Sequence, residues 1–214
     1  MQEHAHHDDE SGHSHPHAPA AKDEKIHSYY QLLGLALKEL LIEKDIVTAR
    51  EIREAIEFRD SITPALGASI VARAWTDAAF KQRLLADGTE AIKEFGVDVG
   101  ATELVVVENT PSVHNMIVCT LCSCYPRAVL GLPPSWYKSR EYRARAVREP
   151  RAVLKEFGTE IADSVEVRVH DSTADMRYLV LPMRPQGTEK LNEEQLAPLI
   201  TRDCMVGVSL PRSG

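Results

Sequence analysis

The sequence predicts an α+β, or mixed α/β, fold in which a helical N-terminal part precedes a globular part that mixes helices and strands. Apolar residues recur at helical spacing through roughly the first hundred residues. Short runs rich in Val, Ile and Leu then alternate with further helical segments. Hydrophobic residues make up 43% of the 214-residue chain, which is enough to form a core. We therefore expect one globular domain with an extended arm.

Five helices are expected before residue 100. The first begins near Ile26, and Leu33, Leu37, Leu40 and Leu41 share one of its faces. The boundaries of the others are marked by Thr48 and Glu51 as a capping box, Pro64 in a first turn, Asp77 as an N-cap and Gly96 as a stop signal.

The second half of the chain is expected to mix both kinds of element. The predicted strands are 104–107, 116–118, 165–169, 178–181 and 205–210. The predicted helices are 140–147, 150–157 (ended by Gly158) and a helix through Leu199 that Asn192 caps.

The chain is expected to have three parts. Residues 1–25 are polar, contain six histidines and show no apolar period, so we predict a disordered tail that can bind metal loosely. Residues 26–100 form the helical N-terminal arm and its helices. Residues 101–214 form an α/β globular domain, which holds the candidate metal site.

Charge and composition narrow the class of protein. A net charge of −7 argues against a nucleic-acid partner. No apolar run approaches the roughly 20 residues needed to span a bilayer, and the N-terminus has no apolar segment of a secretory signal. We expect a cytoplasmic protein without a membrane partner, in a compartment where thiols stay reduced unless they are catalytic or bound to metal.

A basic stretch between Lys138 and Arg151 needs its own interpretation. It contains six basic residues against two glutamates. Such density can form a nucleic-acid-binding patch, but the acidic balance of the whole chain favours a subunit interface or a solvated helix face.

The cysteines indicate a local site. Three of the four lie within six residues, in Cys119-Thr120-Leu121-Cys122-Ser123-Cys124, whereas a disulfide framework would spread them along the chain. A metal bound by Cys122 and Cys124 would lie against the amide nitrogens of Ser123 and Cys124. If both amides deprotonate, they close three fused chelate rings, and Cys119 adds a fifth donor. One position then stays open for a substrate.

Three interpretations of this run remain open from the residues alone. The anionic nitrogen and sulfur donors favour a trivalent ion in an open catalytic site, which departs from the tetrahedral preference of zinc. A structural zinc site, which would make the chain a non-catalytic zinc-binding interaction module, would need a fourth ligand, such as Cys204 or His114. The third possibility is a buried or oxidised thiol cluster without function.

The chain resembles the α subunits of nitrile hydratases from about Leu32 to Leu210. The cysteine run, with Val118 before it and Tyr125-Pro126 after it, is similar to their metal-binding signature. Further similar segments are Val71–Trp75, Leu85–Thr89, Glu108–Pro111, Val113–Asn115, Gly131–Lys138, Arg177-Tyr178, Leu181-Pro182, Arg184-Pro185, Gly187-Thr188 and Thr201–Asp203.

The resemblance implies a fold and a metal centre. The globular domain would be a layered α-β-β-α structure, and the helical arm would wrap a partner subunit. Cys119 would bind the metal as a thiolate, Cys122 as a sulfinate and Cys124 as a sulfenate, together with the amides of Ser123 and Cys124. Thr120 is similar to the cobalt branch, which implies one low-spin cobalt(III) ion per chain in preference to iron(III).

The resemblance also implies the reaction and the partners. Water would add to the carbon–nitrogen triple bond of a small nitrile to give an amide, with the Cys124 sulfenate oxygen as nucleophile or as base toward water. Arginines of a β subunit, or of two smaller chains in its place, would hold the cysteine oxygens. A metal-loading chaperone is a further possible partner.

Two positions depart from the nitrile hydratase pattern. Arg127 stands where tryptophan is usual, and His170 stands where an aromatic residue is common. A guanidinium group suits an anionic substrate such as thiocyanate, and Arg127 resembles the γ subunit of thiocyanate hydrolase. The segments between Gly96 and Cys119 and from Phe157 to Pro185 favour nitrile hydratase. The simpler alternatives are a salt bridge for Arg127 and a polar surface or interface position for His170.

Overall fold

The structure, a computed structural model, describes residues 28–213, so the His-rich tail predicted at residues 1–25 lies outside the described residues. Contacts divide the chain into two compact units, residues 1–51 and residues 52–214. The expected divisions at residues 25 and 100 stay predictions. No helix within residues 28–213 is both long and apolar enough to cross a membrane.

The described part of the first unit contains α1 (Tyr29–Glu43) and the start of α2 (Ala49–Ser61), which continues into the second unit. The carboxylate of Glu51 accepts a 2.7 Å hydrogen bond from the Thr48 N–H group, and the Thr48 hydroxyl accepts one of 3.1 Å from the Glu51 N–H group. The predicted capping box is therefore confirmed.

α1 keeps its apolar side chains exposed. Leu33, Leu37 and Leu40 are exposed, and no residue of this helix is buried by the described part of the chain. A helix of this composition usually buries such side chains against another surface, because exposed apolar area is unfavourable in water.

The second unit begins with helices that pack into its core. They are α3 (Pro64–Thr76), α4 (Ala78–Ala86), α5 (Gly88–Ala91) and the 3₁₀ helix η1 (Ile92–Phe95). The Asp77 carboxylate accepts hydrogen bonds from the N–H groups of Ala79 and Phe80, and Gly96 ends η1 in the left-handed conformation. Both predicted boundary signals are confirmed.

Within residues 28–213, four strands form two parallel pairs. β1 (Glu103–Glu108) pairs with β4 (Met176–Leu181), and β2 (Val113–Val118) pairs with β3 (Glu166–Asp171). In the second pair, Val118 at the end of β2 is the register partner of Asp171 at the end of β3. The chain leaves both strands at the same edge, so the loop that follows Val118 starts beside Asp171.

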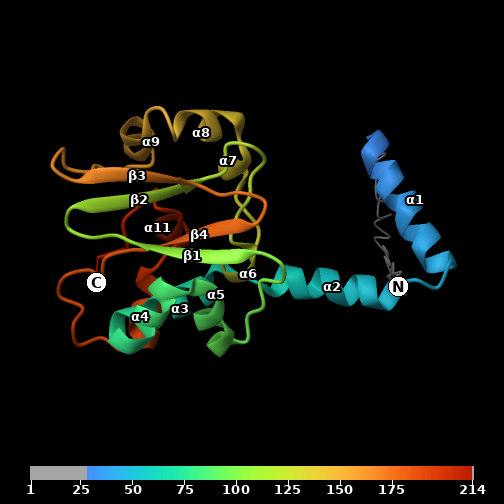
Figure 1. Cartoon of the computed structure of the whole chain (residues 1–214), viewed down its shortest axis with the longest axis horizontal. Coiled ribbons are helices and arrows are strands. Elements are labelled where there is room, and N and C mark those ends of the chain that lie inside the picture. Colours follow the sequence, from blue (N-terminus) through green and yellow to red (C-terminus); the bar gives the residue numbers. More distant parts are fainter. Residues whose placement is uncertain (1–27, 214) are drawn as a thin grey trace, which may run out of the picture. The chain divides into compact units, whose positions relative to one another are not determined.

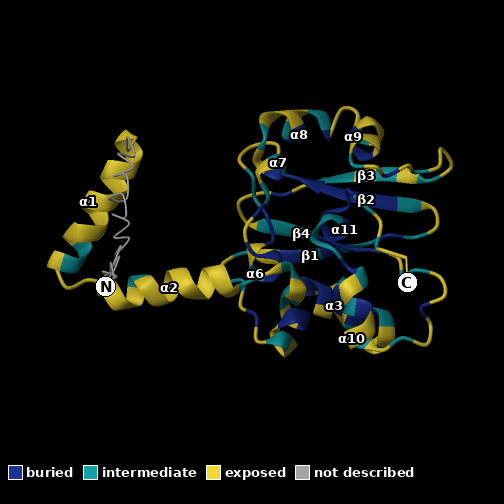
Figure 2. Ribbon diagram, turned by 180° about the vertical axis from the view of Figure 1, so that it is seen from behind, coloured by how far each residue is buried: buried dark blue, intermediate teal, exposed yellow. Residues whose placement is uncertain are grey.

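Helices cover the outer sides of these pairs. In Figure 1, α8 (Arg140–Arg145) and α9 (Pro150–Glu156) lie beyond β2 and β3, whereas α3, α4 and α5 lie beyond β1. The buried residues follow the strands and the inner sides of these helices in Figure 2. The expected layered α-β-β-α arrangement of a mixed α/β protein is therefore confirmed.

Short helices complete the second unit. They are α6 (Arg127–Leu130), α7 (Ser135–Lys138), α10 (Glu193–Leu196), the 3₁₀ helix η2 (Ala197–Leu199) and α11 (Arg202–Val206). Asn192 caps α10 as predicted.

The strand predicted at residues 205–210 is wrong. Its apolar run belongs to the end of α11, where Met205 and Val206 are buried. Thr201 caps this helix through a hydrogen bond from the Cys204 N–H group, and Gly207 ends it with φ +86°. An added Cβ atom at Gly207 would overlap the carbonyl oxygen of Asn115, so glycine is required where α11 meets β2.

Candidate metal centre

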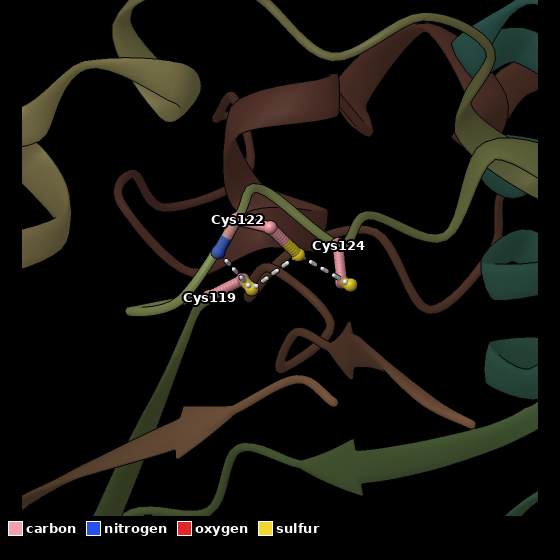
Figure 3. Close-up of side chains that lie close together, drawn as sticks. All are labelled: Cys119, Cys122 and Cys124. Carbon is pink, nitrogen blue, oxygen red and sulfur yellow. Dashed lines mark hydrogen bonds between the residues drawn. The ribbon is translucent and has the colours of Figure 1, made fainter. Parts of the chain in front are cut away.

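The three clustered cysteines meet at the end of β2. Cys119 directly follows this strand and is buried, Cys124 is half-buried and Cys122 is exposed. The Sγ atom of Cys122 lies 3.5 Å from that of Cys119 and 3.1 Å from that of Cys124 (Figure 3). All three sulfur atoms lie within 4.8 Å of one another, so a single ion can contact all of them.

The backbone between the sulfurs is strained. Ser123 has φ +123°, in a region that side chains other than glycine rarely adopt. Such a conformation costs on the order of 1–3 kcal/mol and is typical of functional sites. It turns the chain sharply between Cys122 and Cys124, which brings their two thiols to the same side.

Backbone amides point to the same place as the sulfurs. The Cys122 N–H group donates a 3.3 Å hydrogen bond to the Cys119 Sγ atom. Burial opposes ionisation of this thiol, but hydrogen bonds from the N–H groups of Ser123, Cys122 and Cys124 lower its pKa to about 6. The amides of Ser123 and Cys124 therefore lie near the Cys119 sulfur atom, and their binding to a metal stays a prediction.

Ionisation of Cys124 beside an ionised Cys119 is unfavourable. Burial, the hydrogen bond to Cys122 and the charge of Cys119 raise the pKa of Cys124 to about 12, and the positive charge of Arg177 only partly opposes them. A cation at the centre of the cluster would remove this repulsion between neighbouring thiolates. The donor set therefore fits a metal ion.

A structural zinc site would need a fourth ligand, and the described residues offer none. Among residues 28–213, the cysteine trio is the only group of three or more His, Cys, Asp or Glu side chains whose ligand atoms lie close together, and no fourth such residue joins it. Cys204 is buried in α11 and donates to the Thr201 carbonyl oxygen. The His114 Nε2–H group donates to the Gly207 carbonyl oxygen at 2.8 Å. The cluster thus retains an open side, which tetrahedral zinc with four protein ligands would not have.

Three side chains outside the loop hold its backbone. The Tyr137 hydroxyl donates to the Cys124 carbonyl oxygen at 2.8 Å, and Arg143 donates to the Leu121 carbonyl oxygen at 3.3 Å. The Asp171 carboxylate accepts two hydrogen bonds from Thr120. Sequence reasoning missed these residues because their role depends on contacts across 13, 22 and 51 positions of the chain.

An open cavity of about 690 Å³ lies beside the cluster. Its lining includes Cys122, Ser123 and Cys124, together with the side chains of Arg127 and Arg177. A small molecule in this cavity would therefore meet both the cysteine loop and cationic groups. Arg127 opens α6 three residues after Cys124, which places it in the lining.

His170 has a different environment. Its Nε2–H group donates a 2.8 Å hydrogen bond to the Asn115 Oδ1 atom, and its ring lies 5.0 Å from that of Tyr178. It is not among the described residues that line the cavity. The imidazole links β2 to β3, and among the described residues it forms no hydrogen bond with the cysteine loop.

Several basic side chains between Lys138 and Arg151 form hydrogen bonds or salt bridges within the chain. Arg145 forms salt bridges with Glu149 and Glu156, both at 2.6 Å, and Arg151 donates to carbonyl oxygens of the segment that precedes β3. Together with the contact between Arg143 and the cysteine loop, these bonds give the stretch a structural role.

Comparisons with known proteins agree with this geometry. The family model of the nitrile hydratase alpha chain matches residues 28–209. The chain is 55% identical over 178 residues to the low-molecular weight cobalt-containing nitrile hydratase subunit alpha of Rhodococcus rhodochrous, covering 82% of this chain and 86% of the relative. It is 40% identical over 208 residues to the thiocyanate hydrolase subunit gamma of Thiobacillus thioparus, covering 92% and 85%.

A solved structure is similar along nearly the same length. It is a double mutant of the Fe-type nitrile hydratase from Comamonas testosteroni Ni1, with a TM-score of 0.79 and 46% sequence identity. The match covers 86% of this chain and 90% of that chain.

Proposed function

This chain belongs to the nitrile hydratase α-chain family, and we propose that it is the metal-bearing catalytic subunit of an enzyme that hydrates a nitrile to the corresponding amide. The observation that carries this proposal is the convergence of three sulfur atoms and two backbone amides at the wall of an open cavity. Such a centre would place the open coordination position of a metal next to a cavity that admits a small substrate.

We propose cobalt(III) as the metal, held by the sulfurs of Cys119, Cys122 and Cys124 and by the amide nitrogens of Ser123 and Cys124. The strongly anionic donors favour a trivalent ion, and the cobalt-containing relative supports cobalt over iron. A low-spin cobalt(III) ion would supply Lewis acidity and an open coordination position.

Residues of this chain would supply the other groups that the reaction needs. Cys122 as a sulfinate and Cys124 as a sulfenate would present oxygen atoms at the cavity wall. The Cys124 sulfenate would act on the nitrile carbon as a nucleophile, or on water as a base. The carbonyl group of Cys124 is held by Tyr137, so the side chain keeps its direction toward the cavity.

We propose a β subunit, or two smaller chains in its place, as the obligate partner. Leu121 is 88% exposed in the cysteine loop, and α1 exposes a series of apolar side chains, so no residue of the described range 28–213 covers either region. Partner arginines would neutralise the cysteine oxygens. The free thiols need a reducing compartment before a metal is loaded, which supports a cytoplasmic location.

Thiocyanate hydrolysis is the second candidate function, and one observation favours it. Arg127 and Arg177 both line the cavity, and no ion pair of Arg127 is found among the described residues. Two guanidinium groups suit an anion such as thiocyanate, which would be converted to carbonyl sulfide and ammonia. The similarity to a thiocyanate hydrolase subunit gamma supports this alternative.

Product analysis separates the two candidates. The chain would be expressed with its partner subunits in cobalt medium, and the purified complex would receive aliphatic nitriles, aromatic nitriles or thiocyanate. Amide without carbonyl sulfide is the expected result, whereas carbonyl sulfide and ammonia from thiocyanate alone would support the second candidate. A complex with Cys124→Ser should form neither product, and retained turnover would exclude the proposed role of Cys124.

A further inference from the structure

The first residue inside the cysteine loop is held by a carboxylate from the neighbouring strand. The Thr120 N–H group donates to the Asp171 Oδ1 atom at 2.9 Å, and the Thr120 hydroxyl donates to the Oδ2 atom at 2.6 Å. Both carboxylate oxygens are therefore bonded to the same residue. Charge-assisted hydrogen bonds of this kind are stronger than those between neutral groups.

The strand register creates this contact. Asp171 ends β3 and pairs with Val118, which ends β2 immediately before Cys119. The Ser172 N–H group donates to the Val118 carbonyl oxygen at 2.7 Å, so the parallel pairing continues just past Asp171. The carboxylate is thus fixed by a regular sheet beside the point where the loop begins.

The hydrogen bonds between Thr120 and Asp171 also determine which backbone amides of the loop face the expected metal site. The Thr120 amide is directed to Asp171, whereas the Cys122 N–H group donates to the Cys119 sulfur at 3.3 Å. If Thr120 were released, its amide could turn inward and the strained conformation of Ser123 could relax. The loop keeps its metal-chelating conformation only if neither change occurs.

We propose that Asp171 is a positioning residue that holds Thr120 so that the loop keeps its metal-chelating conformation. The effect is geometric: the two hydrogen bonds set the direction of the chain between Cys119 and Cys122. Asparagine at this position can accept from the Thr120 N–H group and donate to its hydroxyl, so it should preserve most of the effect. This inference rests on the proposed function, because it assumes that the loop binds cobalt.

The experiment uses the complete complex with its partner subunits, carrying Asp171→Ala, Asp171→Asn or Thr120→Val. Cobalt per chain is measured after loading at limiting cobalt, and the rate of cobalt loss to a strong chelator is then followed. The mass of the peptide that contains the cysteine loop reports oxidation of Cys122 and Cys124. Glu166→Ala is the matched control, since it removes an acid from the other end of β3 that bonds only to Arg168 among the described residues.

Asp171→Ala should increase the rate of cobalt loss by about tenfold or more, as expected when a residue that orients a ligand is removed. Asp171→Asn should restore most of the retention, Thr120→Val should give an intermediate rate, and Glu166→Ala should match the wild type. Wild-type cobalt retention in both Asp171→Ala and Thr120→Val would overturn the inference. Failure of Asp171→Asn to restore retention would overturn the geometric explanation.

The wild-type complex distinguishes this inference from the proposed function. If it binds no cobalt, the proposed function fails whatever the variants do. If it binds cobalt and both Asp171→Ala and Thr120→Val hold the ion as well as the wild type, only the inference fails. Should Asp171→Ala not fold, the Thr120→Val variant retains the carboxylate and tests the hydroxyl bond by itself.

Discussion

The hydroxyl group of Tyr137 donates a 2.8 Å hydrogen bond to the carbonyl oxygen of Cys124, and this bond joins α7 to the last residue of the cysteine loop. Tyr142 makes the same kind of bond, at 2.7 Å, to the carbonyl oxygen of Ile117 in β2. The two tyrosines therefore differ in the segment that they hold and agree in the chemistry of the bond.

Replacing Tyr137 with phenylalanine should lower the free energy of unfolding by about 1 kcal/mol, as for other buried hydrogen bonds. Tyr142→Phe should have a similar effect. Only Tyr137→Phe should also alter the visible absorption of the cobalt centre, because it frees the backbone of Cys124. Thermal denaturation and absorption spectra of the two complexes provide the check; equal spectra would show that Tyr137 does not orient the loop.

Stability should decrease as the pH falls below about 6.5, the ordinary pKa of histidine. Burial lowers the pKa of His114, although the bond to the Gly207 carbonyl oxygen opposes the shift. The unfolded chain therefore takes up a proton at a higher pH than the folded chain. The contribution of neutral His114 to the free energy of unfolding is fully present above the ordinary pKa. It is lost as the pH falls through the lowered pKa of the folded chain.

The geometry around His114 explains this direction. Its Nε2–H group donates to Gly207, and its Nδ1 atom lies 3.4 Å from the Asn109 side-chain nitrogen, which can only donate. Protonation of Nδ1 would place two donors against each other. We expect His114→Gln to reduce the fall in Tm of the complex between pH 7 and pH 5. An unchanged pH profile would assign the loss to other groups.

Arg127 should matter for an anionic substrate and much less for a neutral one. If the complex hydrolyses thiocyanate, Arg127→Trp is expected to reduce kcat/KM for thiocyanate about tenfold or more, the effect of losing one hydrogen bond to a charged group. Turnover of aromatic nitriles should be retained. Arg83→Gln is a suitable control, because Arg83 pairs with Glu94 and does not line the cavity. Equal losses for both substrates would indicate that Arg127 supports the structure instead.

Gly207 should be much less tolerant of alanine than Gly158. Both have positive φ angles, of +86° and +78°, but an added Cβ atom meets backbone atoms of Asn115 and Met116 at Gly207 and nothing within 4 Å at Gly158. Gly158→Ala should lower the unfolding free energy by about 1 kcal/mol. Gly207→Ala should lower it by about 3 kcal/mol or more. Denaturant titration compares them, and equal losses would show that β2 moves away without difficulty.

Local signals account for the parts of the fold that the sequence predicted correctly. Thr48 with Glu51, Asp77 and Asn192 are capping residues whose hydrogen bonds span only a few positions, so their roles can be read from the chain. The apolar run at residues 205–210 was misassigned because its alternation is typical of a strand. The cap at Thr201 and the tight approach of Gly207 to Asn115 place it in a helix end.

The candidate site also contains some residues that the sequence predicts and others that only the fold brings together. The cysteines and their amides form one short segment, so their spacing predicts the donors. Asp171 and Tyr137 reach the loop only because of the strand register and the position of α7, which one sequence does not reveal. The roles of Arg127 and His170, which stand where aromatic residues are usual, were equally open, and only Arg127 lies in the cavity lining.

The most direct test of the central claim is the metal content of the purified wild-type complex, measured by elemental analysis after expression with cobalt, iron and zinc all supplied. The account predicts one cobalt ion for each copy of this chain, held by the loop from Cys119 to Cys124. One zinc ion per chain with all cysteines reduced, or no bound metal in a folded complex, would contradict it.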